Sequence, residues 1–323
     1  MTSRAPWRAR VAAACAVVTL GAASALAASA LAASALTAST IAAPATAARA
    51  PVVQAAVFPG ASWATIPPES LSAACRAGLD HATELTRALP TTGAMAITGG
   101  RVLWAYGDVE KLSYLASVRK SLLAMLYGKY VANGTITLDA TLADLGIDDV
   151  DGLLPAEKAA TVADLLGARS GVYHEAANAA CTGCGSTAGD PPGPRGTVPH
   201  GTYFLYNNWD FNALGTIFEQ RTGQDIYAAF GADIATPIGL EDYRLDAQRK
   251  SRRPQVSVHP AYHFYLSTRD MARVGYLMLR DGQWQGRQIV PRDWVRRMTT
   301  AVTHVPDMHP DDLTKGPFGY GYL

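Results

Sequence analysis

The chain has 323 residues, long enough for one large domain or two interleaved ones, because a single hydrophobic core stops growing near about 250–300 residues. Hydrophobic residues make up 49% of the chain and charged residues 17%, which excludes the composition of a disordered protein. The formal net charge is +1, and this balance argues against a nucleic-acid partner.

An export signal is predicted over residues 1–49. Arg4, Arg8 and Arg10 precede an uncharged, alanine-rich segment in which Ala-x-Ala sites repeat. A membrane anchor and a lipoprotein site at Cys15 are the alternatives, but Ala, Ser and Thr partition weakly into lipid, and the residues before Cys15 fit a lipoprotein site poorly. We therefore expect cleavage by signal peptidase, a secreted or cell-envelope location and no stable membrane insertion of the mature chain.

After the signal, a Pro- and Ala-rich linker is predicted over 50–68 and one domain over 69–323. An amphipathic helix is expected at about 69–88. Two short apolar segments, 94–98 and 102–106, then flank Gly99-Gly100, a pattern typical of a β-hairpin.

The rest of the chain is predicted to be mainly helical, with a long Gly/Pro-rich loop over 176–202 of the kind that is usually functional. The helices are expected at 118–132, 161–166, 209–222 and 268–281. Asn133-Gly134 ends the first of them. The last residues, 318–323, resemble a strand. This order predicts an α+β fold.

The cysteines that follow the signal are Cys75, Cys181 and Cys184, an odd number in an oxidising compartment. Cys181 and Cys184 could form a local disulfide, remain thiols, act as a redox pair or bind zinc with His174 and His200. The loop context and the histidine spacing match no common redox or zinc pattern, so no metal or other cofactor is predicted. One cysteine should be left over.

The segment Ser117-Val-Arg-Lys120 opens the apolar helix that follows the hairpin. A serine hydroxyl is a weak nucleophile unless a neighbour takes its proton. Residues i and i+3 share one helix face, so the Lys120 amine can reach the Ser117 hydroxyl, and burial there would make the lysine a plausible base. The alternative is a helix N-cap serine beside a solvated lysine.

A second candidate, Tyr206-Asn207-Asn208, lies after the long loop and before a helix. A tyrosine beside a lysine can act as an acid or base, and a nearby amide can orient a substrate carbonyl. The alternative is a buried tyrosine followed by an asparagine cap. The order of the two motifs, each before a helix, favours the catalytic interpretation.

These motifs, together with Phe211–Gly223, Ala168–His174 and Ser267–Gly282, resemble the β-lactamase-related serine hydrolases from about residue 70 onward. That group includes class C β-lactamases, D-alanyl-D-alanine carboxypeptidases, family VIII esterases and 6-aminohexanoate-dimer hydrolases. The resemblance implies a β-lactamase/transpeptidase-like fold, an antiparallel sheet flanked by helices with an inserted helical domain. It also implies that Ser117 is acylated, that Lys120 and Tyr206 move its proton, and that Asn208 contacts the substrate.

The third motif of that family, Lys-Thr-Gly or His-x-Gly on a C-terminal strand, is not found, and its position would fall beyond Leu323. We therefore expect a C-terminally incomplete domain with little activity of its own. The predicted function is hydrolysis of an ester or amide, with esters and short amides favoured over β-lactams. A penicillin-binding-like or degenerate module that only captures a ligand is the alternative. The oligomeric state is left open.

Three further groups are assigned structural roles. His259 and His263 could line a pocket, but hydrogen-bonded structural histidines are the favoured interpretation. The basic cluster Arg249–Arg253 is predicted to be a solvated loop.

Overall fold

The computed structural model describes residues 57–180, 185–309 and 319–323. The predicted signal at 1–49, with Cys15, lies outside the described residues, as do Cys181 and Cys184. Within the described chain, residues 66–90 belong to one compact unit, and residues 58–65 and 91–323 belong to a second.

The first unit contains a short 3₁₀ helix η2 (Pro68–Ser70) and helix α1 (Ala73–Arg87). The hydroxyl of Ser72 accepts a hydrogen bond from the Cys75 backbone N–H at 3.1 Å and caps α1. The predicted helix at 69–88 is confirmed, and it begins later than expected because Ser72 satisfies its first free amides. Cys75 lies on α1, and its pairing stays a prediction.

The second unit opens with the predicted hairpin. Strand β1 (Gly93–Thr98) pairs antiparallel with β2 (Arg101–Gly107), in register Thr98 to Arg101. Gly99 and Gly100 both have positive φ, 55° and 78°, which a two-residue hairpin turn requires and glycine adopts without strain.

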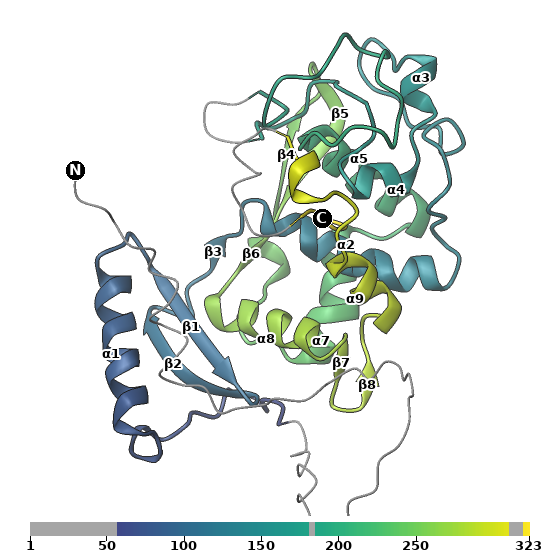
Figure 1. The fold of residues 1–323 in the computed structure, drawn as a ribbon. Coiled ribbons are helices and arrows are strands. Elements are labelled where there is room, and N and C mark those ends of the chain that lie inside the picture. The colour runs from purple at the N-terminus through teal and green to yellow at the C-terminus, as the bar shows by residue number, and fades with distance from the viewer. Residues whose placement is uncertain (1–56, 181–184, 310–318) are drawn as a thin grey trace, which may run out of the picture. The chain divides into compact units, whose positions relative to one another are not determined.

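The predicted single antiparallel sheet is not what the described residues form. They hold four separate two-stranded sheets (Figure 1). The remaining strands are β3 (Ser113–Tyr114) with β6 (Tyr265–Leu266), β4 (Arg249–Arg253) with β5 (Ser257–His263), and β7 (Gln283–Trp284) with β8 (Arg287–Gln288). Residues 319–323 form one β-bridge, Tyr320 to Thr303, rather than the expected strand, and other hydrogen bonds, such as that from Leu323 N–H to the Leu166 carbonyl at 3.2 Å, also hold them.

The prediction of a loop at Arg249–Arg253 is wrong, because these residues form β4. Its mostly exposed basic side chains hid the strand, since pairing with β5 uses the backbone and leaves the side chains in water. Lys250 is an exception, because its ammonium lies between the carboxylates of Glu219 and Asp225.

The core of the second unit surrounds two buried helices, α2 (Val118–Ala132) and α5 (Asn208–Thr222), and β5 packs against α5 (Figure 1). Both helices are apolar on most sides, as expected for helices inside a domain. The other helical segments are α3 (Pro155–Lys158), α4 (Val162–Leu166), α6 (Ile226–Phe230), η3 (Gly231–Ala235), α7 (Thr236–Ile238), η4 (Leu245–Ala247), α8 (Thr268–Leu279), α9 (Arg292–Thr299) and η5 (Val305–Asp307).

Residues 58–65, expected to be linker, are packed into the second unit. The Phe58 ring contacts the rings of Tyr276 and Trp284, and the indole N–H of Trp63 donates to the Arg269 carbonyl at 3.2 Å. Over the described ranges, none of the helices combines the length and the apolar character needed to cross a membrane.

Candidate active site

Ser117 stands at the start of α2 with its side chain exposed. Ser117 occupies the N-cap position, but its hydroxyl makes no capping hydrogen bond to the helix. The residue before it, Ala116, has φ +45°, a backbone conformation that costs a non-glycine residue of order 1–3 kcal/mol and often occurs at functional sites. This turn presents the serine at the surface.

Lys120 lies one turn further on and is buried, with 2% of its surface exposed. Its Nζ is 2.8 Å from Ser117 Oγ and is hydrogen-bonded to the Tyr206 hydroxyl. The Tyr206 hydroxyl in turn donates to Ser117 Oγ at 2.7 Å. The three side chains singled out in the sequence thus form a closed triangle of hydrogen bonds, with the serine on its open side.

Electrostatics favour a neutral amine in this triangle. Burial, reinforced by the neighbouring Arg119 guanidinium, lowers the pKa of Lys120 from 10.5 to about 6. The rings of Tyr206 and Phe211, 4.5 and 4.7 Å from Nζ, favour the ammonium, but loss of water around the amine is the larger effect. Burial also raises the pKa of Tyr206, although the hydrogen bond to Ser117 and the charge of Arg119 oppose the change.

Tyr206 is held by its backbone and by the residue after it. Its carbonyl accepts from Ala188 N–H at 2.9 Å, which fixes the end of the long loop beside it. Asn207 caps α5, accepting from Trp209 N–H at 2.9 Å, and its amide nitrogen donates to the Val172 carbonyl. The asparagine cap that the sequence offered as the alternative is therefore present at Asn207, beside the hydrogen-bonded Tyr206 hydroxyl.

Asn208, the predicted substrate contact, is buried. Its amide nitrogen donates to the Ala179 carbonyl at 2.6 Å, so it holds the loop at residues 178–179. Its Oδ1 is buried and has no hydrogen-bond partner among the described residues. That oxygen is the only acceptor of this side chain. A contact between Asn208 and the substrate stays a prediction.

A buried carboxylate, Asp149, was not among the residues predicted from the sequence. It accepts hydrogen bonds from Trp209 Nε1 and Ser257 Oγ, both at 2.6 Å, and from Val258 N–H at 2.7 Å. Although burial opposes the change, these hydrogen bonds hold the pKa of Asp149 below its usual value. Asp149 therefore ties the start of α5, directly after the Tyr206 motif, to β5. No local pattern marks such a residue.

The two histidines assigned structural roles are both hydrogen-bonded. His259 is buried, and its Nδ1 is 3.0 Å from the Thr216 hydroxyl. His263 lies between the hydroxyls of Tyr114 and Ser251, and burial, with Arg119, lowers its pKa to about 4. Within 57–180, 185–309 and 319–323, no group of three His, Cys, Asp or Glu side chains could hold a metal ion.

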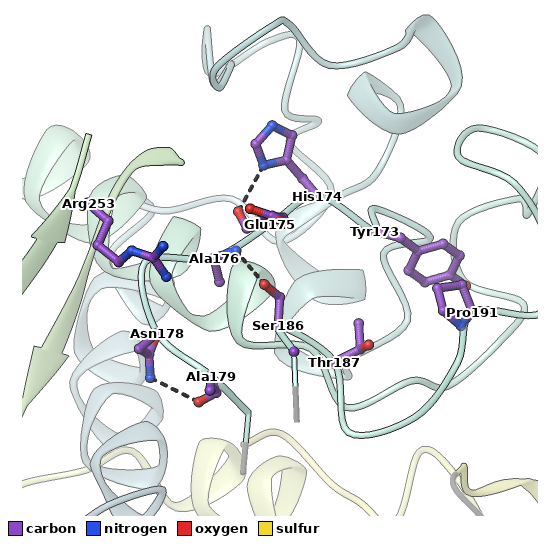
Figure 2. Close-up of a pocket in the computed structure, with 11 residues that line it drawn as sticks. Tyr173, His174, Glu175, Ala176, Asn178, Ala179, Ser186, Thr187, Pro191 and Arg253 are labelled. Atoms are coloured by element: carbon purple, nitrogen blue, oxygen red, sulfur yellow. Dashed lines mark hydrogen bonds between the residues drawn. The ribbon is translucent and has the colours of Figure 1, made fainter. Parts of the chain in front are cut away.

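A polar recess of about 350 Å³ lies between β4 and the long loop. Figure 2 shows Arg253 reaching from β4 toward Ala176 and Asn178, with Tyr173 and Pro191 on the other side. Its wall includes Asn178 and Ala179, whose carbonyls accept from Asn208. The recess is therefore built on the same loop that the Tyr206 motif holds in place.

Comparisons with known proteins bear on the family and the fold. A family profile described as beta-lactamase matches residues 75–323. No curated protein sequence matches the chain significantly. Among solved structures, SurE with D-Leu superposes with a TM-score of 0.52 at 22% identity, covering 78% of this chain and 62% of SurE.

Two further solved structures match similarly. A Bacillus anthracis protein designated a 6-aminohexanoate-dimer hydrolase has a TM-score of 0.54 at 17% identity, over 74% of this chain and 66% of its own. The octameric penicillin-binding protein homologue of Pyrococcus abyssi has a TM-score of 0.53 at 21% identity, over 75% and 63%. The chain spans less than two thirds of each structure. The predicted β-lactamase/transpeptidase-like fold is confirmed by these matches.

Proposed function

This chain belongs to the beta-lactamase family, and from that premise we propose that it is an exported serine hydrolase acting through an acyl-enzyme on Ser117. The observation that carries the proposal is the triangle of Ser117, Lys120 and Tyr206 around a buried amine. Neither an ordinary helix cap nor a surface lysine would need such an arrangement.

In the proposed acylation, neutral Lys120 accepts the Ser117 proton as Oγ attacks the substrate carbonyl carbon. The C–O or C–N bond of the substrate then breaks, and the proton passes from Lys120 through Tyr206 to the leaving alcohol or amine. The acyl group stays on Ser117. A water molecule, giving its proton to the same pair, attacks the ester and releases the acid.

The developing oxyanion needs N–H donors. Two amides of the first turn of α2 are already used, because Val118 N–H donates to the Leu115 carbonyl and Lys120 N–H donates to the Ser117 carbonyl. We assign the Ser117 N–H as the donor that this part of the chain supplies.

For substrate, we propose esters or short amides rather than β-lactams. The sequence of α8 and its flanks, Ser267–Gly282, resembles the esterase and amide-hydrolase branches of the family. The recess beside Asn178 offers both charges, Glu175 and Arg253, to a polar acyl or leaving group. Secretion or cell-envelope location rests on the export signal predicted from residues 1–49.

The nucleophile is tested by labelling the full chain with a fluorophosphonate probe and locating the adduct by mass spectrometry. We expect an adduct on Ser117 and none in Ser117→Ala. The matched control is Ser121→Ala, on the same helix, because the Ser121 hydroxyl donates to the Leu323 carbonyl and not to the triangle. Labelling of Ser117→Ala at the wild-type rate would refute the assignment.

Turnover distinguishes a hydrolase from a ligand-capturing module. We expect steady release of p-nitrophenol from p-nitrophenyl acetate, abolished in Ser117→Ala and kept in Ser121→Ala. A single burst equal to the enzyme concentration, with no further release, would instead support covalent capture without hydrolysis. Nitrocefin, a β-lactam, and a p-nitroanilide of a short acid, tested beside the ester, rank the three substrate classes.

A further inference from the structure

Arg119, between the nucleophile and the lysine in sequence, is a buried cation, with 1% of its surface exposed. Its Nη2 donates to Asn212 Oδ1 at 3.1 Å, and its guanidinium lies 4.4 Å from the centre of the Tyr262 ring. Its other terminal nitrogen, Nη1, is buried and has no partner among the described residues. Every group that contacts the guanidinium is uncharged.

The lack of a charged partner distinguishes Arg119 from Arg273, the second fully buried arginine. Arg273 is equally buried, but its Nη2 lies 2.8 Å from Glu241 Oε1, and Nη1 donates to the Ile238 carbonyl at 3.0 Å. Buried charges are normally paired in this way, because an unpaired one loses its hydration without compensation. Arg119 has no carboxylate within salt-bridge distance in the described part of the chain.

The field of an unpaired cation reaches its neighbours with little screening in a dry interior. An arginine keeps its positive charge throughout the working pH range, so its influence does not titrate. A second positive charge on the adjacent Lys120 is disfavoured, and negative charge on the hydroxyls of Tyr206 and Ser117 is favoured. One residue therefore biases the whole triangle toward losing a proton.

We propose that Arg119 is the positioning residue that keeps the Lys120 amine unprotonated near neutral pH, acting through its charge and without touching the substrate. This inference rests on the proposed function. It gives a role to a guanidinium that has no carboxylate partner among the described residues and that Asn212 and Tyr262 hold without neutralising it.

The other titratable groups facing α2 do not replace it. From β5 and β3 come His263 and Tyr114, which are hydrogen-bonded to each other, and burial, with Arg119, keeps the pKa of His263 low, so it adds no charge above about pH 5. Asp233 in η3 is the carboxylate that contacts α2, and it is paired with Lys129 at 2.6 Å and with the Tyr130 hydroxyl at 2.8 Å, in the last turns of the helix. Three tyrosines, Tyr262, Tyr227 and Tyr320, remain neutral because burial raises their pKa values.

The test measures the rate of fluorophosphonate labelling of Ser117 against pH, a readout that needs no knowledge of the natural substrate. In wild type we expect the labelling rate to fall toward low pH as Lys120 becomes protonated. We call this fall of the rate with pH the acid limb. In Arg119→Met, which keeps most of the volume without the charge, the limb should move to higher pH by about one unit or more, because the like charge is gone. Labelling at pH 6, where about half of the wild-type Lys120 is neutral, should then fall by about fivefold or more.

Arg119→Lys restores a positive charge and should bring the limb back toward wild type. Asn212→Leu removes the hydrogen-bond partner and keeps the charge, so it should lower the thermal midpoint and leave the limb in place. Arg273→Met is the matched buried-arginine control and should also leave the limb unmoved. If Arg119→Met does not fold, Arg119→Gln carries the same expectation.

The proposed function and the proposed role of Arg119 can be refuted independently. If wild type shows no labelling on Ser117, the proposed function is wrong. If wild type is labelled with an acid limb, but the limb stays in place in folded Arg119→Met or Arg119→Gln, the role of Arg119 is wrong and the proposed function stands. A limb that moves equally in Arg119→Met and Arg119→Lys would show a packing effect and also refute the role.

Discussion

Replacing Lys120 by methionine should make the protein inactive and more stable at the same time. In the folded chain the pKa of Lys120 is about 6, against 10.5 as the ordinary value, because burial and then Arg119 disfavour the ammonium. The unfolded chain therefore binds one more proton than the folded chain between those two pH values. The contribution of Lys120 to the free energy of unfolding is largest above about pH 10.5. It falls as the pH drops and reaches its minimum below about pH 6.

The magnitude follows from the pKa difference. Each pH unit inside the window is worth about 1.4 kcal/mol, so at pH 7 holding the amine neutral costs up to about 5 kcal/mol. Hydrogen bonds to Ser117 and Tyr206 offset part of this, at about 1 kcal/mol each. We therefore expect Lys120→Met to be more stable than wild type by about 1–3 kcal/mol at pH 7, and the gain to shrink by up to about 2.7 kcal/mol between pH 7 and pH 9.

The assay is chemical denaturation of both proteins at pH 7, 8 and 9, paired with fluorophosphonate labelling at pH 7. Labelling of Lys120→Met should be slower by about 10²–10⁴-fold, the usual contribution of a general base. Lys129→Met is the control, since Lys129 lies on the same helix but is half exposed and pairs with Asp233 at 2.6 Å. A stability difference for Lys120→Met that is constant over pH 7–9 would show that the folded lysine is protonated.

Three further outcomes are expected. The rate of wild-type labelling should fall about tenfold per pH unit well below pH 6, because the pKa of Lys120 is about 6. Circular dichroism checks that the fold persists over this range. A flat profile from pH 7 to 4.5 would contradict a neutral lysine base. Asn207→Ala should lower the free energy of unfolding by about 1–2 kcal/mol through loss of the α5 cap. It should also slow labelling, because the cap holds Tyr206. Unchanged stability in a urea titration would refute the cap. Asp149→Ala should cost about 3 kcal/mol or more, since it leaves the Trp209 and Ser257 donors buried without partners. The control Asp139→Ala, at an exposed position, should cost less than about 0.5 kcal/mol, and equal effects of the two would contradict the role of Asp149.

Local patterns were enough for much of the fold. The apolar spacing and the Asn133-Gly134 stop placed α2 correctly, and the Gly99-Gly100 pair located the β1–β2 turn, because helix ends and tight turns depend on nearby residues. They failed at Arg249–Arg253, where the strand is decided by its partner β5. The antiparallel sheet was implied by the family resemblance and not by any local pattern, since pairing between distant strands leaves no local signal.

For the site, the sequence alone determined its chemistry: a serine and a lysine one helical turn apart, with a tyrosine motif later in the chain, and an ordered set of motifs that indicates the family. Only the tertiary structure decided that the tyrosine hydroxyl contacts both and that the lysine is buried while the serine is exposed. It also decided that Arg119 is buried with no carboxylate beside it in the described part of the chain. Spacing within one helix is set by backbone geometry, so it can be read from the sequence. Burial and charge pairing depend on which distant segments, here β5, α5 and the loop before it, come together around that helix.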